Sequence, residues 1–255
     1  MIDDGFYCMD CFDGMAQIDD KSIDMILCDL PYGTTQCSWD VVIPFEPLWA
    51  EYKRIIKDNG AIVLFGMEPF SSYLRLSNIE MYKYDWIWDK VKGTGFLNAK
   101  KQPMRNHEII SVFYKSQCKY YPQMTENHER KVSLKKRNQP QTEVYGKMDK
   151  ATHYDSTQRY PRSIQVFSTD TQISSIHSTQ KPVALCEYLI KTYTDVGDLV
   201  LDNCAGSCST GIACHNTGRR FIGFEKDKEI FEKAYKRLTE HKAQMSLFDI
   251  GLERK

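Results

Sequence analysis

A carboxylate, a proline and a tyrosine stand together near the start of the 255-residue chain, in the stretch "ILCDLPYG" at residues 26–33. The apolar residues before them are typical of a buried strand, so Asp29 and Tyr32 are expected where that strand ends. A carboxylate can accept hydrogen bonds from a ligand, and a tyrosine ring can stack on a flat one. The grouping indicates a binding or catalytic site. The alternative is a purely structural one, in which a strand ends in a proline-containing turn with the same sequence.

Small residues form a second candidate site, in "DLVLDNCAGSCSTGIAC" at residues 198–214. They lie between a predicted strand and a predicted helix, where backbone N–H groups and the helix dipole can face a ligand. Glu225 ends the next predicted strand, 19 residues beyond Gly206. An acid at about this distance can bind the two hydroxyls of a ribose in a nucleotide-binding βαβ unit. The spacing favours a nucleoside site over the alternative, a tight turn followed by a solvated acid.

Alternating strand-like and helix-like patterns must position these two motifs. Before residue 115, the predicted elements are strands at 5–10, 23–28, 61–66 and 82–90, with helices at 44–60 and from about Pro69. After residue 177 they are a helix at 184–194, a strand at 198–204, a helix after Gly206, a strand at 219–225 and a helix at 226–241. Strands that alternate with helices predict a parallel sheet covered on both faces.

The segment from Lys115 to about Ile176 interrupts this pattern, because its apolar spacing is lost and polar residues dominate. Residues 115–165 contain eleven Lys or Arg and five Asp or Glu, a net charge of +6 (11 − 5), whereas the whole chain has a formal net charge of zero. Such a basic segment predicts an insertion or a small domain that binds a polyanion. The chain is therefore divided into residues 1–114, 115–176, 177–241 and a tail at 242–255.

Composition places the chain among ordinary globular proteins, with 42% hydrophobic and 27% charged residues. The amino terminus lacks the pattern of a signal peptide, and no window approaches about 18 uninterrupted apolar residues, which together predict a cytosolic protein. The nine cysteines are an odd number in largely apolar surroundings, which favours reduced thiols. Cys8 and Cys11 have the spacing of zinc ligands, but no second such pair completes a site, so we expect no metal.

The two motifs together resemble those of a known enzyme family. "DLPY" at residues 29–32 looks like the Asp-Pro-Pro-Tyr motif of amino-methyltransferases, and "DNCAGSCST" at 202–210 is similar to their Asp-Pro-Phe-x-Gly-Ser-Gly-Thr cofactor loop. With the catalytic motif first and the cofactor motif last, the chain resembles the beta group of DNA adenine-N6 and cytosine-N4 methyltransferases. Three further stretches are similar to segments of that group: "FYCMDCFDGMAQIDDKSIDMILCDLPYG", "MRNHEIISVFYK" and "HSTQKPVALCEYLIKTYTDVGDLVLD".

This resemblance covers nearly all of the chain except residues 115–176, and it implies a fold. We expect an α/β protein with a circularly permuted, Rossmann-like sheet of the S-adenosylmethionine-dependent methyltransferase type and with helices on both faces. Residues 1–114 would form the catalytic half, and residues 177–241 the cofactor-binding half. Residues 115–176 would be an inserted target-recognition region for double-stranded DNA.

The resemblance also implies a chemistry for Asp29, Leu30, Pro31 and Tyr32. An exocyclic amine on an aromatic ring is a poor nucleophile because its lone pair is delocalised, so acceptors must draw the nitrogen toward sp³ geometry. The Asp29 carboxylate and the Leu30 carbonyl would be these acceptors, and Tyr32 would stack on a base flipped out of the duplex. Leu30 stands where the family has proline, but Pro31 still favours an extended Leu30, so its carbonyl direction should survive.

A larger set of residues is implied for S-adenosylmethionine, with Asp10 by the adenine ring, Glu225 at the ribose hydroxyls and Asp202 near the methionine. The residues expected at the cofactor are Asp10, Asp29, His177, Ser178, Thr179, Lys181, Asp202, Cys204, Gly206, Ser207 and Glu225. Cys208 replaces a glycine of the family's pattern, so its Cβ would crowd the methionine or strain the backbone. A DNA-binding protein with a decayed cofactor site is therefore one alternative.

Basic residues of the target-recognition region alternate with Asn, Gln and Tyr, which can contact base edges as well as phosphates. The residues expected at DNA are Arg130, Lys131, Lys135, Lys136, Arg137, Arg159 and Arg162. For the reaction we expect methyl transfer to N6 of a flipped adenine, because the catalytic motif begins with aspartate rather than serine. Transfer to cytosine N4 is the alternative, and RNA is a less expected substrate.

Three expectations concern the setting of such an enzyme. The family points to a bacterial or phage-encoded cytoplasmic enzyme of restriction-modification, and pairing through the catalytic domain would allow a homodimer. "QMSLF" at residues 244–248 looks like the Gln-x-x-Leu-Phe peptide that docks on the bacterial sliding clamp, through Gln244, Leu247 and Phe248. The alternative is that Leu247 and Phe248 pack on the chain's own sheet.

Overall fold

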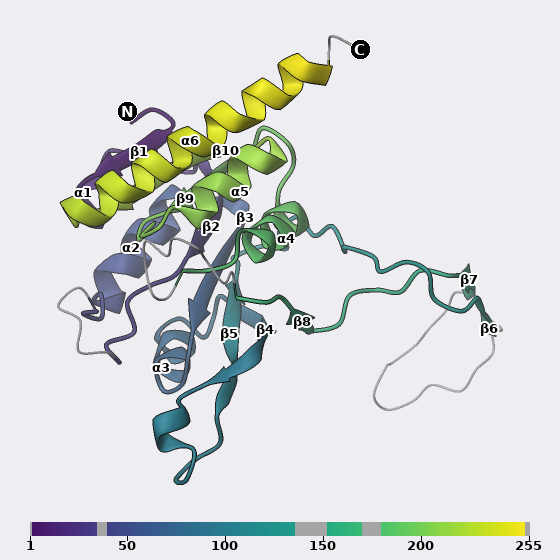
Figure 1. Cartoon of the computed structure of the whole chain (residues 1–255). Coiled ribbons are helices and arrows are strands. Elements are labelled where there is room, and N and C mark those ends of the chain that lie inside the picture. Colours follow the sequence, from purple (N-terminus) through teal and green to yellow (C-terminus); the bar gives the residue numbers. More distant parts are fainter. Residues whose placement is uncertain (1, 35–39, 136–151, 170–179, 253–255) are drawn as a thin grey trace. The chain divides into compact units, whose positions relative to one another are not determined.

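The computed structural model describes residues 2–34, 40–135, 152–169 and 180–252, with the backbone alone at 135, 152 and 245–252. The chain forms two compact units, one of residues 1–121 together with 163–255, and the other of residues 122–162. All the helices of the described residues and an eight-stranded sheet belong to the first unit (Figure 1). None of these helices is long and apolar enough to cross a membrane.

The sheet of the first unit has the strand order β1, β10, β9, β2, β3, β5, β4, β8. The parallel strands are β1 (Gly5–Cys8), β10 (Arg220–Glu225), β9 (Leu199–Asp202), β2 (Ile23–Cys28) and β3 (Ile56–Gly66). The remaining strands are β5 (Arg105–Phe113), antiparallel to β3 and β4, then β4 (Tyr82–Thr94), and β8 (Ile164–Val166), parallel to β4. The sheet is therefore mixed, which corrects the prediction of a parallel sheet.

The antiparallel part has a simple cause in the chain order. β4 and β5 follow one another along the sequence and are joined by a hairpin, whereas parallel neighbours need a crossover connection of a dozen or more residues. The parallel part brings together segments that are far apart in the sequence. Ile26 of β2 pairs with Leu201 of β9, so the two motifs of the sequence analysis lie on adjacent strands.

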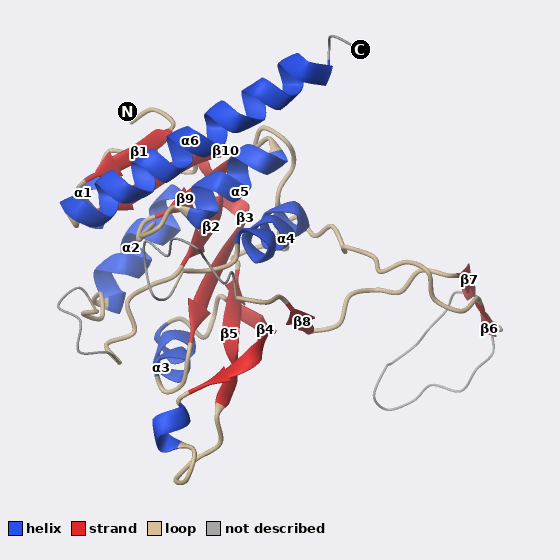
Figure 2. Ribbon diagram, in the orientation of Figure 1, coloured by secondary structure: helices blue, strands red, loops and turns tan. Residues whose placement is uncertain are grey.

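Helices cover both faces of the sheet (Figure 2). They are α1 (Cys11–Met15), α2 (Phe45–Ile55) and α3 (Phe70–Ser77) on one face, with α4 (Val183–Tyr193), α5 (Ser209–Thr217) and α6 (Lys228–Leu252) on the other. Alternate side chains of β2 enter the two cores: Ile26 packs toward the first three helices, and Leu27 toward α4 and α5. Both are fully buried, so β2 is apolar on both faces, as a central parallel strand should be.

Two predicted helix boundaries are wrong. The helix expected at 44–60 ends at Ile55, because Ile56 begins β3 and pairs with Ile23 of β2. An ion pair of 2.7 Å between Lys57 Nζ and Asp24 Oδ1 joins the same two strands. The tail expected at 242–255 is helical as far as Leu252, because α6 continues through it.

The second unit is small and contains a two-stranded antiparallel sheet of β6 (Lys131–Lys135) and β7 (Thr152–Ser156). Backbone hydrogen bonds between Thr125 and Arg159, each 2.9 Å long, extend this pairing. The region expected at 115–176 is broader than this unit, because β8 is part of the large sheet. The start of the expected region, residues 115–121, also belongs to the first unit, where Lys119 Nζ forms an ion pair of 2.6 Å with Asp198.

Candidate active site

The carboxyl ends of the parallel strands meet at one edge of the sheet, where a cavity of about 690 Å³ lies. Eleven of the predicted catalytic and cofactor residues line it: Asp10, Asp29, Leu30, Pro31, Tyr32, Lys181, Asp202, Cys204, Gly206, Ser207 and Glu225. The other three predicted residues, His177, Ser178 and Thr179, lie outside the described residues. A volume of this size is within the usual range for small-molecule sites.

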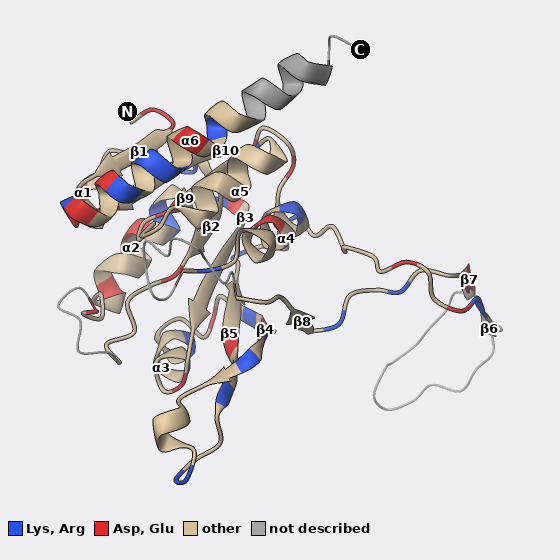
Figure 3. Ribbon diagram, viewed as in Figure 1, with Lys and Arg blue, Asp and Glu red and all other residues tan. Residues whose placement is uncertain are grey.

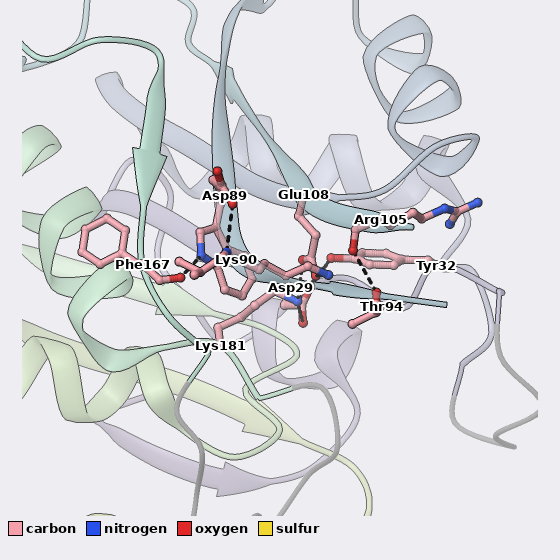
Figure 4. Close-up of polar contacts among 11 residues, drawn as sticks. Asp29, Tyr32, Asp89, Lys90, Thr94, Arg105, Glu108, Phe167 and Lys181 are labelled. Atoms are coloured by element: carbon pink, nitrogen blue, oxygen red, sulfur yellow. Dashed lines mark hydrogen bonds and ion pairs between the residues drawn. The ribbon is translucent and has the colours of Figure 1, made fainter. Parts of the chain in front are cut away.

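Asp29 is the centre of the polar contacts at the end of β2. One of its carboxylate oxygens accepts a hydrogen bond from the Tyr32 hydroxyl, and the other accepts one of 2.6 Å from Lys181 Nζ (Figure 4). The Lys181 ammonium also lies 5.6 Å from the centre of the Tyr32 ring. The three side chains are therefore held together before any ligand binds.

Two residues without a predicted role complete this cluster. Glu108 of β5 has Oε2 at 3.2 Å from Lys181 Nζ, and its Oε1 is 3.2 Å from Nζ of Lys90 on β4 (Figure 4). The Lys90 and Lys181 side chains are each 8% exposed, so this is a buried network. The network contains two carboxylates, of Asp29 and Glu108, and two ammonium groups, of Lys90 and Lys181. Its charges are therefore paired, which is the condition under which buried charges are tolerated.

The electrostatics of the network keep Lys181 charged. Burial alone would lower the pKa of the Lys181 ammonium, but Asp29 and Glu108 outweigh burial and raise it. Burial would likewise raise the pKa of Glu108, but Lys181 and Lys90 reverse the direction and lower it. For Asp29 burial prevails over Lys181 and raises the carboxyl pKa. Burial, followed by the Asp29 charge, raises the pKa of Tyr32 well above its usual range, so the hydroxyl remains a donor.

The second half of the cavity is formed by the ends of β9 and β10. Glu225 accepts hydrogen bonds from the backbone N–H of Gly206 at 3.0 Å and of Asp227 at 2.8 Å, and burial raises its pKa. Asp202 is 4% exposed, and burial raises its pKa to about 7, against opposing hydrogen bonds from Thr210 and from the N–H of Cys204. Two carboxyl groups therefore face this half of the cavity, and each is pinned by N–H or O–H donors.

Cys208 adopts the left-handed backbone conformation, with φ 60° and ψ 33°, at the start of α5. This position suits glycine, because a Cβ there costs roughly 1–2 kcal/mol. The side chain is fully buried against Phe6, Ile212 and Ala234, and it does not line the cavity. Of the two alternatives expected of Cys208, the positive φ bears out the strained backbone, while crowding of the methionine stays a prediction.

Two cysteines, Cys11 and Cys204, line the cavity. Cys204 Sγ accepts a hydrogen bond of 3.6 Å from Asn203 Nδ2, while Cys8 is exposed. Burial raises the pKa of Cys28 to about 12, so this thiol stays protonated. The eight cysteines of the described residues are free, and no group of three metal-ligating side chains occurs in that part of the chain.

A comparison with known protein families bears on this geometry. A model of a DNA methylase family, which acts on adenine N6 or cytosine N4, matches residues 23–236. The chain belongs to this family. The match includes both motifs at the cavity and the second unit, and the family depends on S-adenosylmethionine.

Individual relatives of this DNA methylase agree with the family match. It is 28% identical to Type II methyltransferase M1.MboII of Moraxella bovis, over 89% of this chain and 93% of the relative. It is 25% identical to the DNA adenine methyltransferase YhdJ of Escherichia coli (strain K12), over 88% of this chain and 79% of the relative. A crystal structure of M1.HpyAVI with S-adenosylmethionine, 25% identical, superposes with a TM-score of 0.61 over 91% of this chain and 98% of the other.

The basic residues that were expected at DNA have different surroundings in the DNA methylase. Arg130 forms a two-point ion pair with Asp155, through two hydrogen bonds of 2.7 Å, and Arg159 donates to backbone carbonyls of the second unit. Lys131 and Arg162 are exposed. Lys136, Arg137 and the Lys135 side chain lie outside the described residues.

Asp10 has a structural contact of its own in the DNA methylase. Its side chain accepts a hydrogen bond of 2.9 Å from the N–H of Phe12 and so caps α1. It is exposed and lines the cavity beside Phe12, while Ile230 of α6 lines the cavity near Glu225. Capping does not use all the acceptor positions of a carboxylate, so Asp10 can still accept a hydrogen bond from a ligand.

Proposed function

We propose that this protein transfers the methyl group of S-adenosylmethionine to N6 of an adenine flipped out of duplex DNA. The observation that carries the proposal is the contact of Asp29 with Lys181 and Tyr32 at one wall of the cavity. The opposite half of the same cavity ends in Glu225 and Gly206, a combination suited to a nucleoside. Amine-activating groups and residues suited to a nucleoside therefore line one cavity.

The amine half would work through two acceptors. The Asp29 carboxylate and the Leu30 carbonyl accept hydrogen bonds from the exocyclic amine, which directs the nitrogen lone pair away from the ring and toward the methyl donor. Each carboxylate oxygen has two lone pairs, so Asp29 can accept the amine while it keeps Lys181. When the nitrogen has gained the methyl group it releases a proton, and Asp29 is an acceptor within reach. The raised pKa of Asp29 favours this transfer.

Lys181 and Glu108 would act through Asp29 rather than on the base. Lys181 holds one carboxylate oxygen at 2.6 Å and is itself held by Glu108. This chain of contacts fixes the direction of the remaining Asp29 lone pairs before the base arrives, which lowers the reorganisation needed for reaction. The Tyr32 hydroxyl donates a hydrogen bond to Asp29, and the face of its ring would stack on the base.

The cofactor half fits S-adenosylmethionine on the chemistry of its donors. Glu225 would accept hydrogen bonds from the two ribose hydroxyls, Asp10 would lie at the adenine ring, and Phe12 and Ile230 supply apolar surface beside it. Asp202 and Ser207 would lie near the methionine, together with Gly206, whose positive φ of 49° lets the backbone approach closely. S-adenosylmethionine supplies the electrophilic methyl group when bound there.

DNA is the partner that this activity requires, and the second unit, Pro122–Arg162, is the proposed target-recognition part. Lys131, Arg130, Arg159 and Arg162 would contact phosphates or base edges there, together with Lys135, Lys136 and Arg137. The net charge of +6 over residues 115–165 supports this assignment. DNA affinity should then fall steeply with salt, because phosphate contacts release counterions.

The biological setting follows from the relatives and is proposed with the reaction. A bacterial or phage-encoded cytoplasmic enzyme of restriction-modification fits a family that contains Type II methyltransferases. A homodimer and a sliding-clamp contact through Gln244, Leu247 and Phe248 stay predictions. This last segment belongs to α6, so a clamp would have to bind it as a helix or unwind it.

Cytosine N4 is the second candidate for the methylated amine, because the same family contains enzymes of both kinds. The aspartate at the head of "DLPY" and the similarity to an adenine methyltransferase of Escherichia coli favour adenine. Mass spectrometry of nucleosides from DNA treated with the protein and S-adenosylmethionine decides. N6-methyladenine is expected, N4-methylcytosine would select the alternative, and the absence of both would contradict methyl transfer.

A further inference from the structure

The β4–β5 hairpin carries the most exposed apolar side chains of the first unit. Residues 91–107 are all exposed, and at the tip Phe96 is 78% exposed and Leu97 is 97% exposed. These two residues lie in a short 3₁₀ helix, Phe96–Asn98, between the two strands. Exposed large side chains at the end of a projecting hairpin have a cost in water, which a binding partner would remove.

The same hairpin is strongly basic. Between residues 91 and 107 the chain has four Lys or Arg, which are Lys92, Lys100, Lys101 and Arg105, and no Asp or Glu. None of the ion pairs found among the described residues involves these four side chains. Figure 3 shows the Lys and Arg positions of the hairpin in blue, with Glu108 at its base as the nearest acid of β5. A polyanion therefore fits this surface better than a protein face of mixed charge.

The base of the hairpin is part of the cavity wall. Lys90, Thr94 and Glu108 line the cavity, and the Thr94 hydroxyl donates a hydrogen bond of 3.1 Å to the Arg105 carbonyl (Figure 4). Leu97 follows Thr94 by three residues, at most about 10 Å of extended chain. This length equals about three base steps of DNA, each about 3.4 Å. A base in the cavity and the hairpin tip would consequently contact the same short stretch of duplex.

Backbone hydrogen bonds and an irregularity in strand pairing define the conformation of the hairpin. Val91 has φ 67°, unusual for a β-branched residue, and its backbone N–H donates a hydrogen bond of 2.8 Å to Asp89 Oδ1. The pairing with β5 shifts between Asp89 and Thr94, so an irregularity of β4 redirects the part beyond the cavity. At the tip, N–H groups of Asn98 and Lys101 donate hydrogen bonds of 2.9 and 2.8 Å to Gly95 and Asn98 carbonyls. The positions of Phe96 and Leu97 are thus fixed by backbone contacts.

We propose that this hairpin is a second DNA-contacting element, which presses Phe96 and Leu97 against the base stack beside the flipped base while its lysines and Arg105 bind the flanking phosphates. Apolar wedges of this kind unstack a base step and make flipping easier. The inference rests on the proposed DNA methyltransferase function. It adds an element outside the basic region at 115–176.

The apolar tip is tested by replacing Phe96 and Leu97 with serine together. The matched control replaces Val196, 75% exposed, and Tyr235, 51% exposed, with serine on other surfaces. Methyl transfer from tritiated S-adenosylmethionine to unmethylated plasmid DNA gives kcat/KM for DNA, and calorimetric titration gives the Kd for S-adenosylmethionine. The tip variant should lose at least tenfold in kcat/KM with its Kd unchanged within twofold, and the control should lose less than twofold.

The charged part is tested by replacing Lys92, Lys100, Lys101 and Arg105 with glutamine. The control replaces exposed lysines of α6 in equal number: Lys228, Lys233, Lys236 and Lys242. Anisotropy of a labelled duplex at several salt concentrations gives the slope of log K against log salt concentration. Four lost phosphate contacts should reduce this slope by about 3 to 4, because each contributes about 0.9, and the control should change it by less than 1.

Several results would overturn the proposal. If the wild type methylates DNA, and the tip and charge variants keep its kcat/KM and its salt slope, the hairpin does not contact DNA as proposed. The proposed methyltransferase function would not be affected by that result. A wild type that methylates no DNA would sink the proposed function itself. Sedimentation that shows a wild-type dimer lost in the tip variant would assign the tip to a second copy of the chain. Should the double variant melt early, Leu97→Ser alone, at a 97% exposed position, repeats the test.

Discussion

Lys181 Nζ lies 2.6 Å from Asp29 Oδ2, although the two residues are 152 positions apart in the sequence. The contact joins the segment before α4 to the end of β2 and sets the direction of the carboxylate at the cavity. A carboxylate that is held by a buried ammonium keeps its remaining lone pairs aimed at one place. The proposed amine activation depends on this relationship.

Replacement of Lys181 by methionine should therefore reduce methyl transfer far more than cofactor binding. The variant keeps the length of the side chain but leaves Asp29 without its ammonium partner, and kcat/KM for DNA should fall by about 100-fold, the scale for a lost preorganised contact. The unfolding free energy should fall by about 2 kcal/mol, less than for a fully buried pair, because Asp29 is 27% exposed and Glu108 keeps Lys90. Lys191→Met, at a surface pair, is the control, and equal loss in both would contradict the assigned role.

Replacement of Glu225 by glutamine should weaken S-adenosylmethionine binding. The side chain keeps its size, but a charged acceptor for two hydroxyls becomes a neutral one, and hydrogen bonds to charged groups contribute about 1.5–3 kcal/mol. Calorimetry should show at least a tenfold increase in Kd. Glu229→Gln, on the exposed start of α6, should leave Kd unchanged. An unchanged Kd in the Glu225 variant would remove it from the ribose site.

Asp202 should make stability depend on pH. Its pKa is raised by burial from 3.8 to about 7, so the folded state binds its proton more tightly than the unfolded state does. Stability from this group is complete below about pH 4 and is lost as the pH rises toward 7. The Asp202→Asn side chain stays neutral at every pH. The unfolding free energy of this variant, relative to that of the wild type, should therefore increase by up to about 4 kcal/mol as the pH rises from about 4 to about 7. Urea titrations at several pH values check this; a difference independent of pH would contradict the buried acid.

Cys208 should respond differently to glycine and to alanine. Both variants remove the buried thiol, but only glycine relieves the positive φ of 60°. Cys208→Gly should therefore be more stable than Cys208→Ala by about 1 kcal/mol in urea unfolding. Because the side chain points away from the cavity, both should bind S-adenosylmethionine like the wild type. Equal stability of the two variants would argue against strain at this position.

The parts of the site that the sequence predicts are those that strand ends carry in short motifs. Asp29 and Tyr32 follow an apolar run, and Glu225 stands 19 residues beyond Gly206. The local sequence pattern is therefore enough to predict these residues at the site. Glu108 and Lys90 were missed because their roles depend on strand pairing. A lone acid at the start of the apolar stretch "EIISVF" was the available signal.

Tertiary contacts also explain the errors in the fold. The amphipathic pattern from Pro44 runs past Ile55, but pairing of Ile56 with Ile23 makes the following residues a strand. The charge pattern does not predict the basic hairpin, because the basic segment begins at Lys115 and the four cations between 91 and 107 lie before it. The sequence indicates only the end of a strand and a loop at these four positions.

Methylation in living cells tests the central claim most directly. DNA from cells that express the wild type, sequenced with detection of modified bases, should show methylated adenines in one short sequence context. DNA from cells that express Asp29→Ala at equal level should show none there, because the amine loses its charged acceptor. The same modified bases in both would contradict the account.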